Sequence, residues 1–134
     1  MIVVDANVVA YAVLPGDKTE AALGAFERDP EWVAPPLWRS EVRNVLATTM
    51  RVQGLSLSDA MTAWRHASRL VLDAHLPGDT ARILRLAENA GASAYDCEYV
   101  ALAEALGLAF VTGDGRLAKR FPDLAVSVTE FASA

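Results

Sequence analysis

Short apolar runs alternate with longer amphipathic stretches along the 134 residues of this chain. Short apolar runs bounded by turn residues are typical of strands that are buried on both faces of a parallel sheet. Because helical stretches separate these runs, their order predicts an α/β fold in which helices layer against a central, largely parallel sheet. The five expected strands cover residues 1–4, 32–34, 70–72, 108–112 and 125–128, the last of them at an edge of the sheet.

Capping and breaking residues set the expected helix boundaries. Serine, threonine or aspartate precedes several amphipathic stretches and suits the N-cap, whereas glycine follows three of them and suits a left-handed C-terminal position. We expect Met61 and Leu84 to face the core, and residues 76–78 to form a turn. The expected helices cover 8–14, 19–28 with Thr19 as N-cap, 37–52, a stretch that begins at Ser56 or Ser58, a stretch from Asp79 or Thr80 to Gly91, 93–106, and a short segment that ends at Phe121.

Composition places the chain among ordinary globular domains. Hydrophobic residues make up 53% of it and charged residues 22%, which argues against disorder. Its length suits one domain over residues 1–134 with a buried core. It has no apolar run of membrane-spanning length and no recognisable secretory signal, so we expect a cytoplasmic protein that does not engage a membrane. The single cysteine, Cys97, excludes an internal disulfide framework and a cysteine-rich zinc site.

Four acidic residues stand at positions that favour a shared site. Asp5 and Asp114 each follow a predicted strand, and the carboxyl ends of parallel strands share the sheet edge where ligands bind in open α/β folds. Asp96 lies near the start of a helix, on the same face as inward-pointing residues, and Glu41 borders the buried stripe of the helix over 37–52. Taken singly, each acid also has a structural explanation as a turn residue, a helix-dipole partner or half of an ion pair.

Carboxylates that converge in one place would repel one another. At a separation of ~4 Å and an effective dielectric constant of 20, one pair costs about 4 kcal/mol. That is large against the roughly 5–15 kcal/mol that stabilises a whole domain. Protonation or a bound divalent cation would relieve the repulsion. Oxygen ligands favour Mg²⁺ or Mn²⁺ over Zn²⁺, and His66 and His75 lack the spacing of metal ligands.

Four segments together resemble a known family. They cover residues 3–7, 40–46, 95–104 and 111–117, and read VVDAN, SEVRNVL, YDCEYVALAE and VTGDGRL. In this order and spacing they resemble the PIN-domain ribonucleases, and most of all the VapC toxins of bacterial toxin–antitoxin pairs, over essentially the whole chain. The resemblance implies an α/β/α sandwich, an acidic pocket that binds Mg²⁺ or Mn²⁺, metal-dependent RNA cleavage, a homodimer, and inhibition by a VapB-type antitoxin.

The resemblance also assigns the acidic site residue by residue. Asp5, Glu41, Asp96 and Asp114 fall on the acidic positions of the family, and Asn7 and Thr112 fall on the polar positions that support them. We expect Asp5, Asp96 and Asp114 to hold the metal, directly or through water, and Glu41 either to join them or to orient the attacking water. Asn7 and Thr112 carry no charge and are expected to support the ligands.

An RNA substrate requires some positive charge at the rim of an acidic pocket. The net charge of −5 disfavours broad, nonspecific binding of nucleic acid, so we expect local contacts. Arg43 lies close to Glu41 in sequence, and Arg116 follows Asp114. We expect both arginines to contact phosphates on either side of the cleaved bond.

Three other functions compete with that of a toxin ribonuclease. A PIN-like nuclease outside toxin–antitoxin pairs would keep the same site for another RNA or for DNA. A catalytically silent PIN module that binds RNA or protein would not need the full set of acids that this chain carries. A receiver-like signalling domain also gathers aspartates at strand ends, but Asp96 opens a helix here and Lys119 follows a turn, so it fits poorly.

Overall fold

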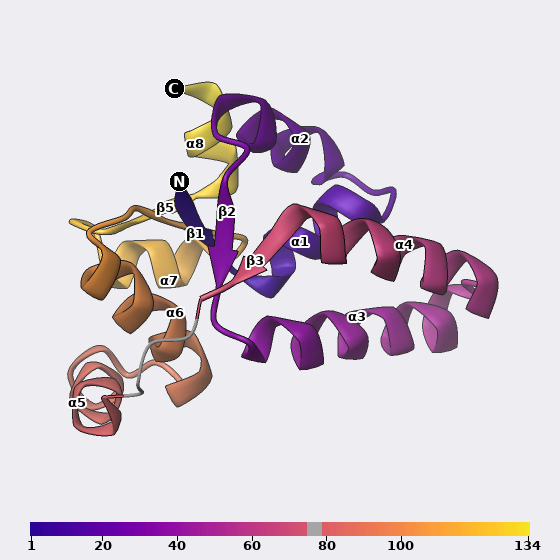
Figure 1. Cartoon of the computed structure of the whole chain (residues 1–134). Helices are drawn as coiled ribbons and strands as arrows, with labels where there is room; N and C mark the ends of the chain where they lie inside the picture. Colours follow the sequence, from indigo (N-terminus) through magenta and orange to yellow (C-terminus); the bar gives the residue numbers. More distant parts are fainter. Residues whose placement is uncertain (75–78) are drawn as a thin grey trace.

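The computed structural model describes residues 1–74 and 79–134, so the turn expected at 76–78 lies outside the described residues. A five-stranded sheet in the order β3-β2-β1-β4-β5 forms its centre (Figure 1). All neighbouring strands run parallel, and β5 lies at an edge, as predicted. The strands are β1 (Ile2–Val4), β2 (Trp32–Ala34), β3 (Val71–Asp73), β4 (Phe110–Thr112) and β5 (Ala125–Ser127).

The described helices include the seven that the sequence predicts and one that it does not. The unexpected helix is α8, where the Glu130 N–H donates to the Ser127 hydroxyl at 3.2 Å. Serine three residues before glutamate is the signature of a capping box, so this signal was present in the sequence. The helices are α1 (Ala6–Val13), α2 (Thr19–Arg28), α3 (Leu37–Gln53), α4 (Leu57–Leu70), α5 (Thr80–Ala90), α6 (Ala94–Leu106), α7 (Gly115–Arg120) and α8 (Val128–Ser133).

Three local expectations were wrong. Thr19 is not the N-cap of α2: the cap is Lys18, and the Thr19 hydroxyl donates to the Leu14 carbonyl at 2.8 Å instead. Met61 and Leu84 do not face the core, since they are 45% and 56% exposed. On α4 the buried residues are alanines, whose small side chains let the helix approach its neighbours closely.

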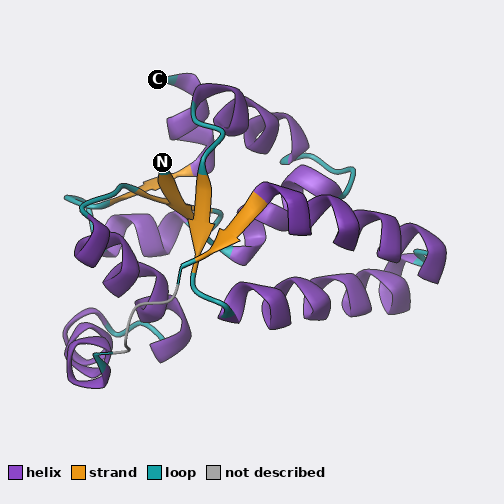
Figure 2. Ribbon diagram, in the orientation of Figure 1, coloured by secondary structure: helices purple, strands orange, loops and turns teal. Residues whose placement is uncertain are grey.

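Two layers of helices enclose the sheet, so the predicted α/β/α arrangement is confirmed (Figures 1 and 2). Helices α1 to α4 lie on one side and α5 to α7 on the other, and α8 packs on α2. This arrangement follows from the strand order. The chain passes from β1 through β2 to β3 in one direction across the sheet, and then from β3 back to β4 and on to β5 in the opposite direction. Right-handed crossovers then place the connecting helices on opposite faces. Among the described residues, no helix is both long and apolar enough to cross a membrane.

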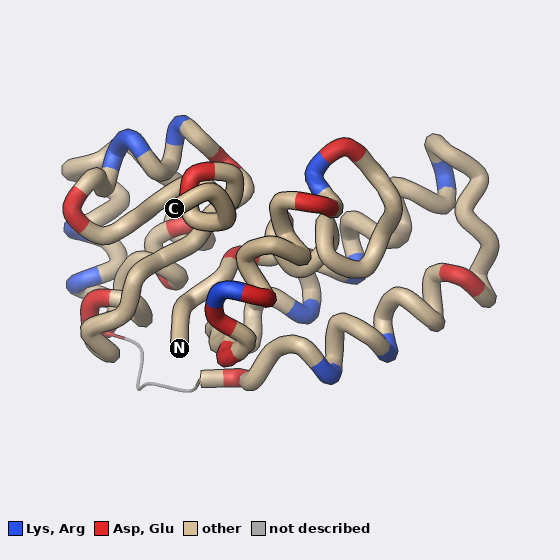
Figure 3. The backbone as a smooth tube through the Cα atoms, turned by 90° about the horizontal axis from the view of Figure 1, so that it is seen from above, with Lys and Arg blue, Asp and Glu red and all other residues tan. Residues whose placement is uncertain are grey.

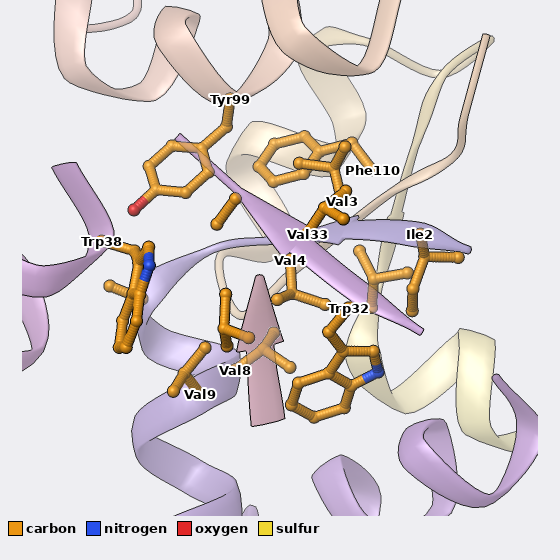
Figure 4. Packing of buried hydrophobic residues seen from close by; sticks show 14 of the residues in the cluster. Ile2, Val3, Val4, Val8, Val9, Trp32, Val33, Trp38, Tyr99 and Phe110 are labelled. Atoms are coloured by element: carbon orange, nitrogen blue, oxygen red, sulfur yellow. The ribbon is translucent and has the colours of Figure 1, made fainter. Parts of the chain in front are cut away.

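The core lies on both faces of β1, β2 and β4 (Figure 4). Val3, Val4 and Phe110 are completely buried, and Trp32 and Trp38 are at most 1% exposed. Full burial of one large apolar side chain contributes roughly 1.5–3 kcal/mol, so β1 and β4 are firmly anchored. The residues that follow these two strands are therefore held in fixed positions.

The strand order also determines where a crevice forms. Strands β1 and β4 are neighbours, but the chain leaves them toward opposite sides of the sheet. Ligands bind outside the carboxyl ends of such a pair of strands in open α/β folds. Asp5 follows β1 and Gly113 follows β4, so both residues lie at this edge.

Candidate active site

Asp5 is a buried acid that residues from both ends of the chain hold in place. Its side chain is 7% exposed and caps α1, where Oδ1 accepts a hydrogen bond from the Val8 N–H at 3.1 Å. The Thr112 hydroxyl donates to Oδ2, and the Gly113 N–H lies 3.2 Å from both carboxylate oxygens. The carboxylate therefore joins the end of β1 to the end of β4.

Burial is the main influence on the electrostatics of Asp5. It raises the pKa of the carboxyl group from 3.8 to about 6, although the hydrogen bonds from Thr112, Val8 and Gly113 act in the opposite direction. The charge on Asp96 raises the pKa further, but its effect is the smallest of these. Repulsion between acids is thus less important than the sequence-based argument assumed, because desolvation of one carboxylate outweighs it.

Thr112 links Asp5 to Asp114. Its side chain is completely buried, and its hydroxyl accepts a hydrogen bond from the Asp114 N–H at 3.0 Å while donating to Asp5. Asp114 is exposed and caps α7, since its Oδ1 accepts from the N–H groups of Arg116 and Leu117 at 2.9 and 3.3 Å. Asp114 therefore has a clear structural role beside the buried acid.

Gly113 brings the end of β4 against the start of α1. A Cβ atom at this position would lie 2.8 Å from Asn7 Cβ and 2.9 Å from Tyr11 Cε2, which is closer than real side chains approach. Only glycine fits without a shift of these neighbours. The sequence reasoning did not single out Gly113, because a glycine beside an aspartate also suits an ordinary turn.

Glu41 extends from α3 into the site, and a tyrosine of α6 forms a hydrogen bond with it. The Tyr99 hydroxyl donates to Glu41 Oε1 at 2.6 Å, across 58 residues of sequence. Burial raises the pKa of the Glu41 carboxyl group, and the charges on Asp96 and Glu98 raise it further, whereas the bond from Tyr99 lowers it. Sequence reasoning missed Tyr99, since its periodicity on α6 is that of any core aromatic residue.

A cavity of about 520 Å³ brings three of the four acids together. Asp5 follows β1, Glu41 lies on α3 and Asp96 lies on α6, and all three line the cavity together with Asn7. Four other predicted site residues are not in its lining, namely Thr112, Asp114, Arg43 and Arg116. The full lining is Asp5, Ala6, Asn7, Leu37, Ser40, Glu41, Asn44, Val45, Tyr95, Asp96 and Tyr99.

The expected substrate-binding arginines lie outside this cavity. The Arg43 guanidinium is 4.7 Å from the ring centroid of Trp64 on α4, and Arg116 is exposed on α7. Arg39 pairs with Asp73 through Nε and Oδ2 at 3.0 Å. Basic and acidic positions are interspersed over the outer helices (Figure 3). Any contact of Arg43 or Arg116 with a substrate would therefore be made beyond the cavity itself.

The donor atoms suit a hard divalent cation. The charged groups in the lining are carboxylates, accompanied by the amides of Asn7 and Asn44, and oxygen donors are the ligands that Mg²⁺ and Mn²⁺ prefer. Burial also raises the pKa of Asp5 and Glu41, and a bound cation would offset the cost of keeping them ionised. Over residues 1–74 and 79–134, no three acidic, histidine or cysteine side chains already form a group that could hold a metal ion.

Comparisons with known proteins agree with this fold. The PIN-domain family model matches residues 2–122. Ribonuclease VapC9 of Mycobacterium tuberculosis is 39% identical over 118 residues, which cover 87% of this chain and 88% of the relative. Ribonuclease VapC3 of Pyrobaculum aerophilum is 32% identical over 132 residues, which cover 92% of this chain and 96% of the relative.

A solved structure supports the fold independently. The crystal structure of PAE2754 from Pyrobaculum aerophilum superposes with a TM-score of 0.79, covering 98% of this chain and 93% of that one at 20% identity. The chain therefore belongs to the PIN-domain family, and more narrowly to the VapC ribonuclease family. The resemblance carried by the four sequence segments is thus confirmed.

Proposed function

We propose that this chain is an endoribonuclease that depends on Mg²⁺ or Mn²⁺ and acts as the toxin of a VapBC pair. The observation that carries the proposal is the cavity at the carboxyl edge of the sheet, whose lining includes Asp5, Glu41 and Asp96. Relatives that cover most of the chain are named VapC ribonucleases, which supports the reaction class.

The carboxylates divide into two roles in this proposal. Asp5, Asp96 and Asp114 would hold the cation, directly or through water. When bound, the cation lowers the pKa of a coordinated water and stabilises negative charge on the leaving oxygen. Asp5 is fixed by the donors that surround it, and Thr112 ties the backbone of Asp114 to the same carboxylate. Thr112 supports the ligands through these bonds, and Asn7, which lines the same cavity, would support them as well.

Glu41 is the base that the reaction requires. Its raised pKa and its place in the lining suit it to orient a water molecule and accept its proton. The water oxygen bonds to phosphorus, the bond from phosphorus to the 3′ oxygen breaks, and solvent supplies the proton that the leaving oxygen needs. The products then carry a 5′-phosphate and a 3′-hydroxyl.

Substrate and partners complete the proposal. Arg43 and Arg116 would contact RNA phosphates that lie beyond the cavity, on either side of the cleaved bond. Because the chain belongs to the VapC family, we propose a cognate VapB-type antitoxin as inhibitor, a homodimer as the working form, and the cytoplasm as the location. Purification of the chain with the product of a neighbouring short gene tests the antitoxin, and light scattering tests the dimer.

The same site suits a PIN-like nuclease that is not a toxin. Growth arrest on induction, relieved by co-expression of the neighbouring gene, distinguishes a toxin from such a nuclease. A silent binding module is disfavoured, because it would not need the four acids, Asp5, Glu41, Asp96 and Asp114, that the resemblance assigns to the acidic positions of the family.

An RNA digestion tests the central claim. The purified chain with Mg²⁺ or Mn²⁺ is expected to cut RNA, whereas chelator or the substitution Asp5→Asn abolishes cleavage. Asp123→Asn is the matched control, because Asp123 is an exposed acid outside the cavity lining and its loss leaves cleavage unchanged. Undiminished cleavage by the Asp5→Asn variant, or by the wild type in the presence of chelator, would contradict a metal-dependent mechanism. Mapping of the cut ends checks for a 5′-phosphate.

A further inference from the structure

Tyr99 carries a hydroxyl group that core packing does not require. The side chain is 1% exposed, and its ring stacks on Phe110 with centroids 5.9 Å apart and planes 11° apart (Figure 4). A phenylalanine would fill the same space. Because burial of a polar group costs free energy unless it is hydrogen-bonded, the hydroxyl must be explained by its partner.

The hydroxyl has a hydrogen bond with the Ala6 backbone, and its side-chain partner is Glu41 in the candidate active site. The hydroxyl lies 2.6 Å from Glu41 Oε1, and Figure 4 shows the oxygen pointing away from Phe110, toward the side of the core where Trp38 of α3 lies. Burial and the neighbouring Glu41 carboxylate hold the pKa of Tyr99 well above its ordinary value, although the backbone hydrogen bond at Ala6 lowers it, so the phenol stays protonated and serves as a donor to Glu41. Among the described residues, no hydrogen bond reaches the second oxygen, Glu41 Oε2.

We infer that Tyr99 is a positioning residue: its hydroxyl fixes one carboxylate oxygen of Glu41 and leaves the other available to the cavity. The inference rests on the proposed role of Glu41. It gives a reason for the buried hydroxyl that packing alone does not supply.

The position of Tyr99 on α6 adds a second consequence. Asp96 lies three residues earlier, on the same helix and in the same cavity lining. The bond from Tyr99 to Glu41 therefore ties α3 to the helix that carries Asp96, and so fixes the two acids relative to each other. A glutamate side chain that is held in one conformation loses the conformational entropy of its rotatable bonds. A group that is already positioned reacts more readily than a mobile one, because this entropy does not have to be lost during the reaction.

A double-mutant cycle distinguishes positioning from packing. Tyr99→Phe removes only the hydroxyl, and we expect kcat on an RNA oligonucleotide to fall about tenfold with KM changed less than about twofold. In a Glu41→Gln background, the same substitution is expected to cause no further fall, since the base is already absent. The inference would be overturned if Tyr99→Phe lowered kcat equally in the wild-type and Glu41→Gln backgrounds, or if the loss of kcat were matched by a lower melting temperature.

A matched control and a second readout complete the test. Tyr11→Phe removes a half-buried hydroxyl that makes no hydrogen bond within residues 1–74 and 79–134, and kcat should stay within about twofold. Crystal structures of the wild type and Tyr99→Phe report the Glu41 rotamer without any activity measurement. We expect Glu41 to lose its single conformation while Asp5 keeps its own, and an unchanged Glu41 rotamer would refute the inference. If the wild type cleaves no RNA, the proposed function fails, and the rotamer comparison still decides the role of Tyr99.

Discussion

The backbone N–H of Gly113 lies 3.2 Å from both carboxylate oxygens of Asp5, although 108 residues separate the two in sequence. This contact joins the carboxyl ends of the neighbouring strands β1 and β4. It requires the backbone at position 113 to approach α1 more closely than any residue with a Cβ atom can. The geometry of the acidic site thus depends on a residue that carries no chemistry of its own.

Gly113→Ala is expected to disturb both stability and activity. The added methyl group would lie 2.8 Å from Asn7 Cβ, so the start of α1 must move away from β4 and disturb Asp5. Overpacking of this kind costs about 1–3 kcal/mol. Gly115→Ala is the control, because no atom lies within 4 Å of its added Cβ and alanine favours the helix. Urea denaturation and RNA cleavage measure the two effects, and equal behaviour of the variants would contradict the close-approach argument.

Thr112→Val tests the buried hydroxyl that holds Asp5. Valine keeps the shape of the side chain but leaves Asp5 and the Asp114 N–H without their partner, which costs roughly 1–3 kcal/mol. We expect a lower free energy of unfolding in urea together with reduced RNA cleavage. Thr48→Val, at an exposed position of α3, should change neither by a measurable amount. A Thr112→Val protein with wild-type stability would show that this hydroxyl contributes little.

Asp5 also predicts how the stability of the metal-free protein depends on pH. Its pKa is about 6 in the folded chain against 3.8 for an ordinary aspartate, so the folded state binds the proton more tightly. Well below pH 3.8 both states are protonated and no penalty arises. Between these two pKa values the free energy of unfolding falls as pH rises, and above pH 6 the loss levels off at about 3 kcal/mol.

The comparison that isolates this effect is with Asp5→Asn. Urea denaturation in the presence of chelator at pH 4 and pH 7 gives the loss of stability for each protein. We expect the wild type to lose about 2 kcal/mol more than the variant over this interval, because part of the total loss already occurs below pH 4 and every other titrating group is shared. Parallel pH profiles would show that the pKa of Asp5 is not raised on folding.

Asp114→Ser separates a structural from a functional role at one position. Serine retains the N-cap of α7 but removes the carboxylate, so the free energy of unfolding should change by less than about 0.5 kcal/mol. Asp114→Ala loses the cap as well, at a cost of about 1 kcal/mol. We expect both variants to lose RNA cleavage if the carboxylate helps to hold the cation. A fully active, stable Asp114→Ser protein would mean that capping is the whole role of Asp114.

Local patterns in the sequence were sufficient for most of the fold. Apolar runs gave the five strands, and glycine marked the ends of helices such as α3 and α6, where Gly54 and Gly107 adopt φ values of 72° and 66°. These signals are local, because burial on both faces of a strand and a left-handed helix end each constrain the residues that occupy them. The same logic placed Asp5 and Asp114 at one edge of the sheet.

The tertiary structure alone decided which side chains meet. The sequence predicted that the four acids share a site, but it could not show that the lining of the cavity excludes Asp114, or that Arg43 lies against a tryptophan. Nor did it reveal the partner of Tyr99. These outcomes depend on how whole helices are rotated and packed against the sheet, and contacts across 58 or 108 residues leave no trace in local periodicity.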